Sequence, residues 1–232
     1  MLYESLLLER MILETRYDRH FLYLDNCGRA MEEFLGRFPG FEVAKASPET
    51  AQMEWRESST AVTFSHEKVD VAQDYPANLA AFNEICPFLI ATVAKHFGVR
   101  SFTRVGNRRL LIKPTSSLEE AVALLSKSPL ISVRNEDLVP FGDRIAERNL
   151  LLRVENDDRG YAFRLSTQER RLTSNIPAAF KVKFENFHPY VLMIDVDVYS
   201  KKAIDATSFS AVDFLRSTEK NLEGNLFALL RM

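Results

Sequence analysis

The sequence predicts the same order of elements twice: a strand in which apolar and polar side chains alternate, a helix, several short strands and a second helix. The first copy ends near residue 98 and the second begins at residue 99 of the 232-residue chain. Residues 6–17 alternate between apolar and charged side chains, and residues 26–38 and 78–97 carry apolar side chains at the helical period. This order predicts an α+β fold: a mainly antiparallel sheet with helices on one face, as a tandem duplication of a strand-helix-meander-helix module would give.

The remaining elements follow from turn signals and from the spacing of apolar residues. Short extended runs at 41–45, 53–56, 60–65 and 69–72 predict a meander, and Pro87 should kink or divide the helix at 78–97. The second half has a strand at 100–113, a helix opened by Ser116 or Ser117, a short run at 131–133, a hairpin of 144–155 and 160–172, a strand at 190–199 and a last helix from Ser208 or Ser210. No Gly-, Ser- or Pro-rich linker separates 1–98 from 99–232, so two tightly packed modules or one domain with a shared sheet are both expected.

Charge and hydropathy point to a cytoplasmic protein. The 30 basic and 32 acidic residues leave a net charge of −2, which removes the global electrostatic argument for nucleic acid or an anionic membrane. The longest nearly apolar stretch, residues 85–94, is about half the ~20 residues that a membrane-spanning helix needs. The N-terminus does not resemble a signal peptide, and Cys27 and Cys86 lie among apolar residues, as buried free thiols do in a reducing compartment.

The motifs of common catalytic sites are missing from the sequence. Its eight glycines form no G-x-G-x-x-G, P-loop or G-x-S-x-G motif, and it contains no C-x-x-C or H-E-x-x-H. The four histidines lie far apart and none has metal-ligand spacing. We therefore expect a protein that is not an enzyme and uses no cofactor, and we assign no catalytic residue.

A strand rich in arginine is the first candidate for a ligand site. In Arg104-Val105-Gly106-Asn107-Arg108-Arg109, alternation places Arg104, Gly106 and Arg108 on one face, with the two arginines roughly 13 Å apart. Glycine inside a strand often marks a close approach by another group. Two guanidinium groups beside bare backbone suit a carboxylate or phosphate, so Arg104, Gly106, Arg108 and Arg109 are our candidate ligand-binding residues. The alternative is a solvated face with salt bridges to neighbouring acids.

Two aspartates on one strand form the second candidate. Asp195 and Asp197 share a face and lie about 6–7 Å apart, a spacing that could hold Mg²⁺ or Mn²⁺. An ordinary half-exposed strand gives the same alternation, and no third carboxylate lies at a compatible spacing, so we predict no metal site.

These observations favour a non-enzymatic cytosolic protein that binds a partner protein or a small anionic ligand. The alternative is a metal-dependent phosphoryl-transfer or hydrolytic enzyme that uses Asp195 and Asp197. A third hypothesis, nucleic-acid binding through a local basic patch, is disfavoured by the net charge; its residues would be Arg100, Arg104, Arg108, Arg109, Arg170 and Arg171. The last helix carries an apolar stripe that could pack on the core or form a homodimer: Val212, Leu215, Leu222, Leu226 and Leu229.

The arginine strand and the Ile194-Asp195-Val196-Asp197 strand resemble those of a sporadically distributed bacterial family of unknown function. Members of that family have a helix ending in proline near the start, an Arg-(Ile/Val)-Gly-x-Arg strand and an Asp-x-Asp strand before a C-terminal helix. This chain departs from the pattern after Arg108, where an aromatic residue and an asparagine usually follow. The resemblance implies the architecture and a bacterial cytosol, and it implies no activity.

Overall fold

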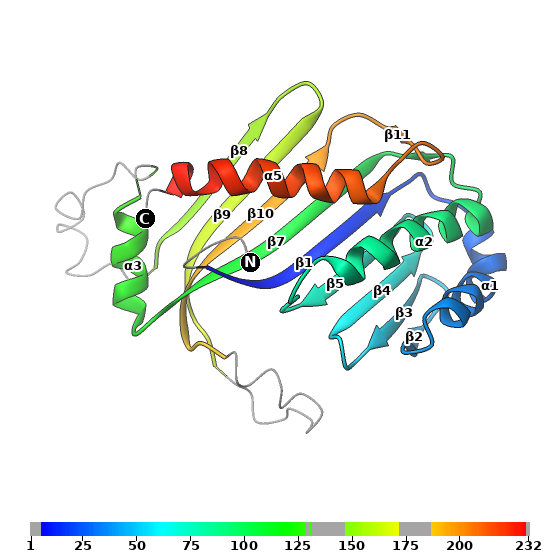
Figure 1. The fold of residues 1–232 in the computed structure, drawn as a ribbon, viewed down its shortest axis with the longest axis horizontal. Helices are drawn as coiled ribbons and strands as arrows, with labels where there is room; N and C mark the ends of the chain where they lie inside the picture. The colour runs from blue at the N-terminus through cyan, green and yellow to red at the C-terminus, as the bar shows by residue number, and fades with distance from the viewer. Residues whose placement is uncertain (1–5, 129, 131–146, 172–186, 231–232) are drawn as a thin grey trace.

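One large antiparallel sheet organises the molecule (Figure 1). The structure is a computed structural model that describes residues 6–128, 130, 147–171 and 187–230, the last eight by backbone alone. The sheet strands, in spatial order, are β2 (Glu42–Ala46), β3 (Thr50–Trp55), β4 (Thr60–Ser65), β5 (Lys68–Asp74), β1 (Leu7–Arg16), β7 (Arg104–Thr115), β10 (Tyr190–Ser200), β9 (Arg159–Glu169) and β8 (Asn149–Glu155). A second, small sheet pairs β6 (Ser101–Phe102) with β11 (Ile204–Asp205). The predicted α+β class is confirmed.

The two halves of the chain meet at the centre of the large sheet. Strands β1 and β7 pair antiparallel, with Leu7 opposite Ile112 at one end and Arg16 opposite Arg104 at the other. Counted outward from this pair, the first half continues with β5, β4, β3 and β2, and the second half continues with β10, β9 and β8. The halves therefore share one sheet, whereas their origin by duplication stays a prediction.

The described helices all pack on the same face of the sheet. They are α1 (Leu22–Arg37), α2 (Ala80–Phe97), α3 (Leu118–Ser126) and α5 (Ala211–Leu230). Figure 1 shows α2 and α5 lying across this face. The first apolar cluster joins α1, α2 and the start of α5 to inward residues of the first half, such as Leu13 and Phe64. The second joins α3 and Leu222 of α5 to inward residues of the second half, such as Leu111 and Val196. Helix α5 thus covers both clusters.

Two helices differ from the sequence prediction. Helix α1 begins at Leu22 rather than near Asn26, because Tyr23 is buried and extends the apolar face by one turn. Pro87 does not divide α2, which runs unbroken from Ala80 to Phe97. Proline frees the carbonyl of the residue four positions earlier. Both Pro87 and Asn83 are exposed, so the freed carbonyl lies on the solvent side of the helix.

Several local predictions are confirmed. Ser117 caps α3 by accepting a hydrogen bond from the backbone of Glu120, and β8 pairs with β9 as the predicted hairpin. The prediction at 131–133 and the outer ends of the hairpin, 144–146 and 172, lie outside the described residues. Cys86 is buried and Cys27 is partly buried, and both are free thiols. In the described part of the chain, no helix is both long and apolar enough to cross a membrane.

Candidate functional site

The second face of the sheet, opposite the helices, carries the predicted arginine pair. Arg104, Gly106 and Arg108 lie on it, as alternation along the strand predicts. Asp195 and Asp197 of the neighbouring strand β10 lie on the same face, since Asp197 is opposite Arg108 in the register. The structure therefore brings together two candidate sites that the sequence analysis treated separately. We call this surface, on which none of the described helices lies, the helix-free face.

Arg104 is held by the protein's own carboxylates. One guanidinium nitrogen lies 2.6 Å from Oδ2 of Asp197, and the other lies 3.2 Å from Oε1 of Glu14. Its Cζ also stacks 4.8 Å from the ring centre of Tyr199. All three partners come from strands that flank β7, so Arg104 ties the centre of the sheet together.

The glycine in the arginine strand is explained by Arg104 itself. A Cβ at position 106 would lie 2.9 Å from Nη1 of Arg104, because that side chain folds back across the bare backbone. Gly160 on β9 has the same role for Tyr199, whose ring would overlap a Cβ at that position. The close approach that Gly106 predicted is therefore made by the protein's own side chains. Arg104 lies over Gly106, Tyr199 lies over Gly160, and the two side chains stack on each other.

Arg108 and Asp195 form a bidentate pair. Nε and Nη2 of Arg108 donate to Oδ1 and Oδ2 of Asp195 at 2.8 and 2.7 Å. These hydrogen bonds are the main reason that the pKa of Arg108 is raised above its ordinary value. Arg164 of β9 approaches Oδ2 of the same carboxylate at 3.9 Å. Both oxygens of Asp195 thus already face guanidinium donors, and a metal ion would have to displace them.

A second group of charges continues the layer onto β1 and β5. Glu14 accepts hydrogen bonds from Arg16 at 2.7 Å and from Lys68 at 3.1 Å, and Lys68 lies 3.2 Å from Asp70. Burial alone would raise the pKa of Glu14, but these hydrogen bonds lower it below its usual value. Desolvation by burial is the larger effect at Asp70 and at Asp197. It raises the pKa of Asp70 despite the nearby Lys68, and that of Asp197 despite the nearby Arg104.

Several ion pairs of this face have the acid beneath and the base above, whereas Arg104 and Asp197 are equally exposed. The side chain of Asp195 is 7% exposed and that of Arg108 is 45% exposed; for Glu14 and Arg16 the values are 17% and 54%. Arg164 is also 54% exposed. The layer is close to neutral in sum, but its solvent side consists mainly of guanidinium groups.

One candidate residue lies elsewhere. Arg109 points to the helix-covered face and is fully buried, because adjacent residues of a strand face opposite sides. Its Nε donates to Oδ1 of Asn107 at 2.9 Å. The predicted set Arg104, Gly106, Arg108 and Arg109 is therefore split between the two faces, and the set cannot form a single site.

Two arginines of the predicted basic patch for nucleic acid also pair with acids. Arg170 forms a bidentate pair with Glu9, and Arg171 lies 3.1 Å from Glu169. Sequence analysis missed the contributions of Glu14, Lys68 and Arg164 to the helix-free face. Alternation assigns each of them to a face of its own strand, but only the order of strands in the sheet brings them beside Arg104 and Arg108.

An open cleft borders the ion-pair layer at Arg164. Its volume is about 480 Å³, and polar and apolar side chains from β8, β9 and β10 line it, including Leu151, Ser166, Gln168 and Met193. Leu151 is half exposed on the outermost strand. The helix-free face thus offers a hollow with apolar walls beside exposed arginines.

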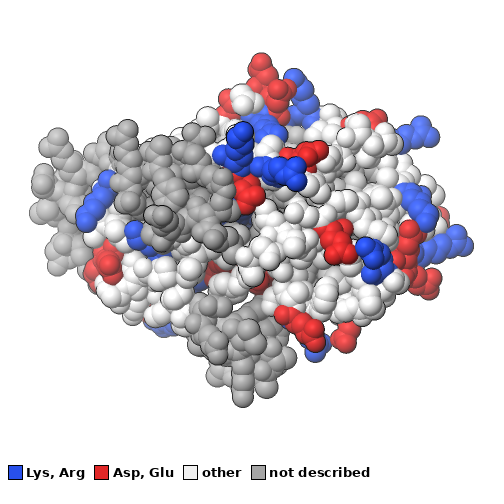
Figure 2. All heavy atoms as spheres, viewed as in Figure 1, with Lys and Arg blue, Asp and Glu red and all other residues white. Residues whose placement is uncertain are grey.

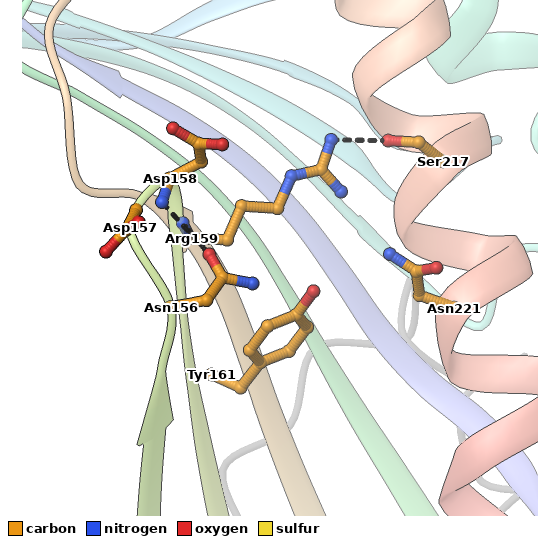
Figure 3. Close-up of a pocket in the computed structure, with 7 residues that line it drawn as sticks. All are labelled: Asn156, Asp157, Asp158, Arg159, Tyr161, Ser217 and Asn221. Atoms are coloured by element: carbon orange, nitrogen blue, oxygen red, sulfur yellow. Dashed lines mark hydrogen bonds between the residues drawn. The ribbon is translucent and has the colours of Figure 1, made fainter.

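A second cleft, of about 500 Å³, lies between the tip of the β8–β9 hairpin and α5 (Figure 3). Arg159 bridges it by donating to Oγ of Ser217 at 2.9 Å. In Figure 3 the side chains of Tyr161 and Asn221 face this space, whereas the carboxylates of Asp157 and Asp158 point away from it. The bridge fixes the hairpin tip on the helix. On the helix-covered side, the basic and acidic side chains of the described residues are intermixed (Figure 2).

The Arg108–Asp195 pair yields a prediction about stability. Asp195→Asn should lower the free energy of unfolding by about 1–3 kcal/mol, because its amide group places a donor against a guanidinium donor. Chemical denaturation of the variant and the wild type measures this loss. Asp213→Asn is the matched control: that exposed carboxylate lies 3.7 Å from Arg216 on α5, and its loss should cost less than about 0.5 kcal/mol. Equal losses in both variants would contradict the assigned role of Asp195.

Comparison of the sequence with known proteins found no match to a protein-family model or to a curated protein. The resemblance to a bacterial family therefore stays a prediction.

Proposed function

We propose that this protein is a non-enzymatic binding module whose helix-free face docks an acidic segment of a partner protein. The docking surface centres on Arg108 and Arg164 and includes the adjoining cleft. The observation that carries this proposal is the layering of the ion pairs, with buried carboxylates below and exposed guanidinium groups above.

Charge complementarity is the first support for an acidic partner. A guanidinium has five N–H donors, and Asp195 engages those of Nε and one of Nη2 on Arg108. The donors of Nη1 remain for an incoming carboxylate. Arg164 contributes further donors, because it touches Asp195 only at 3.9 Å and is more than half exposed. The buried Asp195 holds Arg108 in place, which reduces the entropy that this side chain loses on binding.

A protein partner fits this surface better than nucleic acid does. Binding to nucleic acid draws its strength from cations that neutralise phosphates and release counterions. Here each central base already has a carboxylate beneath it, so the layer carries little net charge. The cleft beside Arg164 has Leu151 and Met193 in its walls, which suits an apolar side chain of a peptide.

The alternative of a small anion at Arg104 and Arg108 has weaker support. Such an anion would have to displace Glu14 and Asp197 from Arg104, because each of the two terminal nitrogens of that guanidinium already faces one of these carboxylates. The ion pairs also weaken the alternative of a metal-dependent enzyme. The oxygens of Asp195 and Asp197 that would bind the metal accept hydrogen bonds from Arg108 and Arg104.

A binding titration tests the proposal. The probe is a fluorescent peptide of alternating glutamate and leucine, and its anisotropy is followed at low salt with the wild type and with Arg108→Gln/Arg164→Gln. We expect the double variant to bind at least about tenfold more weakly, since well-placed arginines are among the strongest contributors to interfaces.

The matched control is Arg37→Gln/Arg216→Gln, which removes two exposed arginines from helices on the opposite side. This variant should bind the peptide as the wild type does. The proposal fails if the two double variants bind alike, if the wild type does not bind the peptide, or if it binds a DNA duplex of equal charge more tightly than the peptide.

A further inference from the structure

Arg109 is a fully buried cation for which the described residues provide little compensation. It lies in the layer between the sheet and the helices, where its register partners are Met11 on β1 and Val196 on β10. Nε donates to the neutral side chain of Asn107 at 2.9 Å. Within the described part of the chain, Nη2 has no hydrogen-bond partner and no carboxylate forms an ion pair with this guanidinium.

A buried guanidinium without an ion-pair partner requires a counter-charge. Arginine stays protonated in proteins, so it cannot relieve its burial by losing a proton, as a lysine can. Fully buried arginines are rare unless they are paired, because the cost of desolvating the charge is high. The neighbouring Arg108 shows the usual solution on the other face, where Asp195 binds it through two hydrogen bonds.

We propose that Arg109, positioned by Asn107, forms an internal site for one small monovalent anion, a halide or a short carboxylate such as formate. One negative charge balances the guanidinium, whereas a dianion would leave an uncompensated buried charge. The apolar neighbours Met11, Leu111 and Val196 also favour an anion that is easily dehydrated. The free donors of Nη2 supply the hydrogen bonds.

The place of the site in the core gives the anion a structural effect. Met11 belongs to the apolar cluster of the first half, and Leu111 and Val196 belong to the cluster of the second half. Arg109 and Asn107 thus lie at the boundary between the two clusters, beneath the helix layer. An anion bound there stabilises the contact between the halves. The site is on the opposite face from the docking surface, so the two proposals can fail separately.

Thermal melts in different sodium salts at constant ionic strength test this site. For the wild type, the melting temperature should rise by roughly 3–6 °C for each tenfold increase in chloride or formate above the dissociation constant. Sulfate at the same ionic strength should shift the melting temperatures of the wild type and of Arg109→Met alike, because it stabilises by exclusion from the protein surface and not by binding. Arg109→Met removes the charge and keeps an unbranched apolar side chain, so its response to chloride and formate should be lost.

Arg216→Met is the matched control, because Arg216 is an exposed arginine on α5 and its loss should leave the anion response intact. The proposal is overturned if Arg109→Met responds to the anions as the wild type does, or if the wild type does not respond. Should Arg109→Met fail to fold, wild-type crystals grown in bromide provide the test by anomalous scattering. A bromide peak within hydrogen-bond distance of Nη2 supports the site; a carboxylate of this chain in that position overturns it.

Discussion

A chain truncated after Phe209 should not fold into a cooperative structure. Truncation removes α5, whose Phe214, Leu215 and Leu222 are buried. Burying a large apolar side chain contributes about 1.5–3 kcal/mol, so these three residues alone account for roughly 5–9 kcal/mol. That is comparable with the whole stability of a typical domain, about 5–15 kcal/mol. Because α5 covers both apolar clusters, its loss also exposes the centre of the sheet to water.

Circular dichroism and thermal melting measure this effect. We expect the truncated chain to be insoluble, or to keep far-UV signal without a cooperative transition. The control is a full-length triple variant, Asp213→Ala/Arg216→Ala/Lys220→Ala, which changes exposed positions of the same helix and should melt near the wild type. A soluble truncated protein with a melting temperature close to that of the wild type would contradict the prediction.

Helix α5 also shows which part of the fold can be predicted from the periodicity of the sequence. The apolar stripe correctly included Leu215 and Leu222, both of which are buried against the chain's own core. It also included Val212, which is only partly buried, and omitted Phe214, which is buried. The side chains of Leu226 and Leu229 lie outside the described residues. Since two central positions of the stripe are used within the chain, they offer no support for the predicted homodimer.

The candidate site marks the limit of reasoning from one strand at a time. Alternation correctly placed Arg104 and Arg108 on one face, and Asp195 and Asp197 on one face. It could not show that these are the same face of the same sheet, because the pairing of β7 with β10 joins residues about ninety positions apart in the chain. Alternation also places Arg109 on the opposite side from Arg108, so its inclusion in the ligand set contradicted that pattern.

The reason for Gly106 was likewise beyond the sequence. A glycine in a strand predicts a close approach, but it does not tell which group approaches. In the structure, the group is the guanidinium of Arg104, two residues away on the same strand. A long side chain can turn back along its own strand, and this choice depends on Glu14, Asp197 and Tyr199 from the two neighbouring strands.

Phe34→Ala should lower the free energy of unfolding by about 3–5 kcal/mol, as is typical for truncation of a buried phenylalanine. Phe34 of α1 is fully buried. Its ring lies 4.9–6.2 Å, between ring centres, from four others: Phe38, Phe41, Phe64 and Phe88. Because these rings come from both helices of the first half and from its meander, they cannot easily close the cavity that alanine would leave.

Chemical denaturation of Phe34→Ala measures the loss, and Phe21→Ala is the matched control. Phe21 precedes the same helix by one residue but is 78% exposed, so its removal should change stability by less than about 0.5 kcal/mol. The two substitutions delete identical atoms, and the main difference between the two positions is their burial. If both variants lost the same stability, α1 would not be packed on the sheet through Phe34. If only Phe34→Ala were destabilised and it lost its cooperative transition as well, the aromatic cluster would be the part of the core on which the whole first half depends.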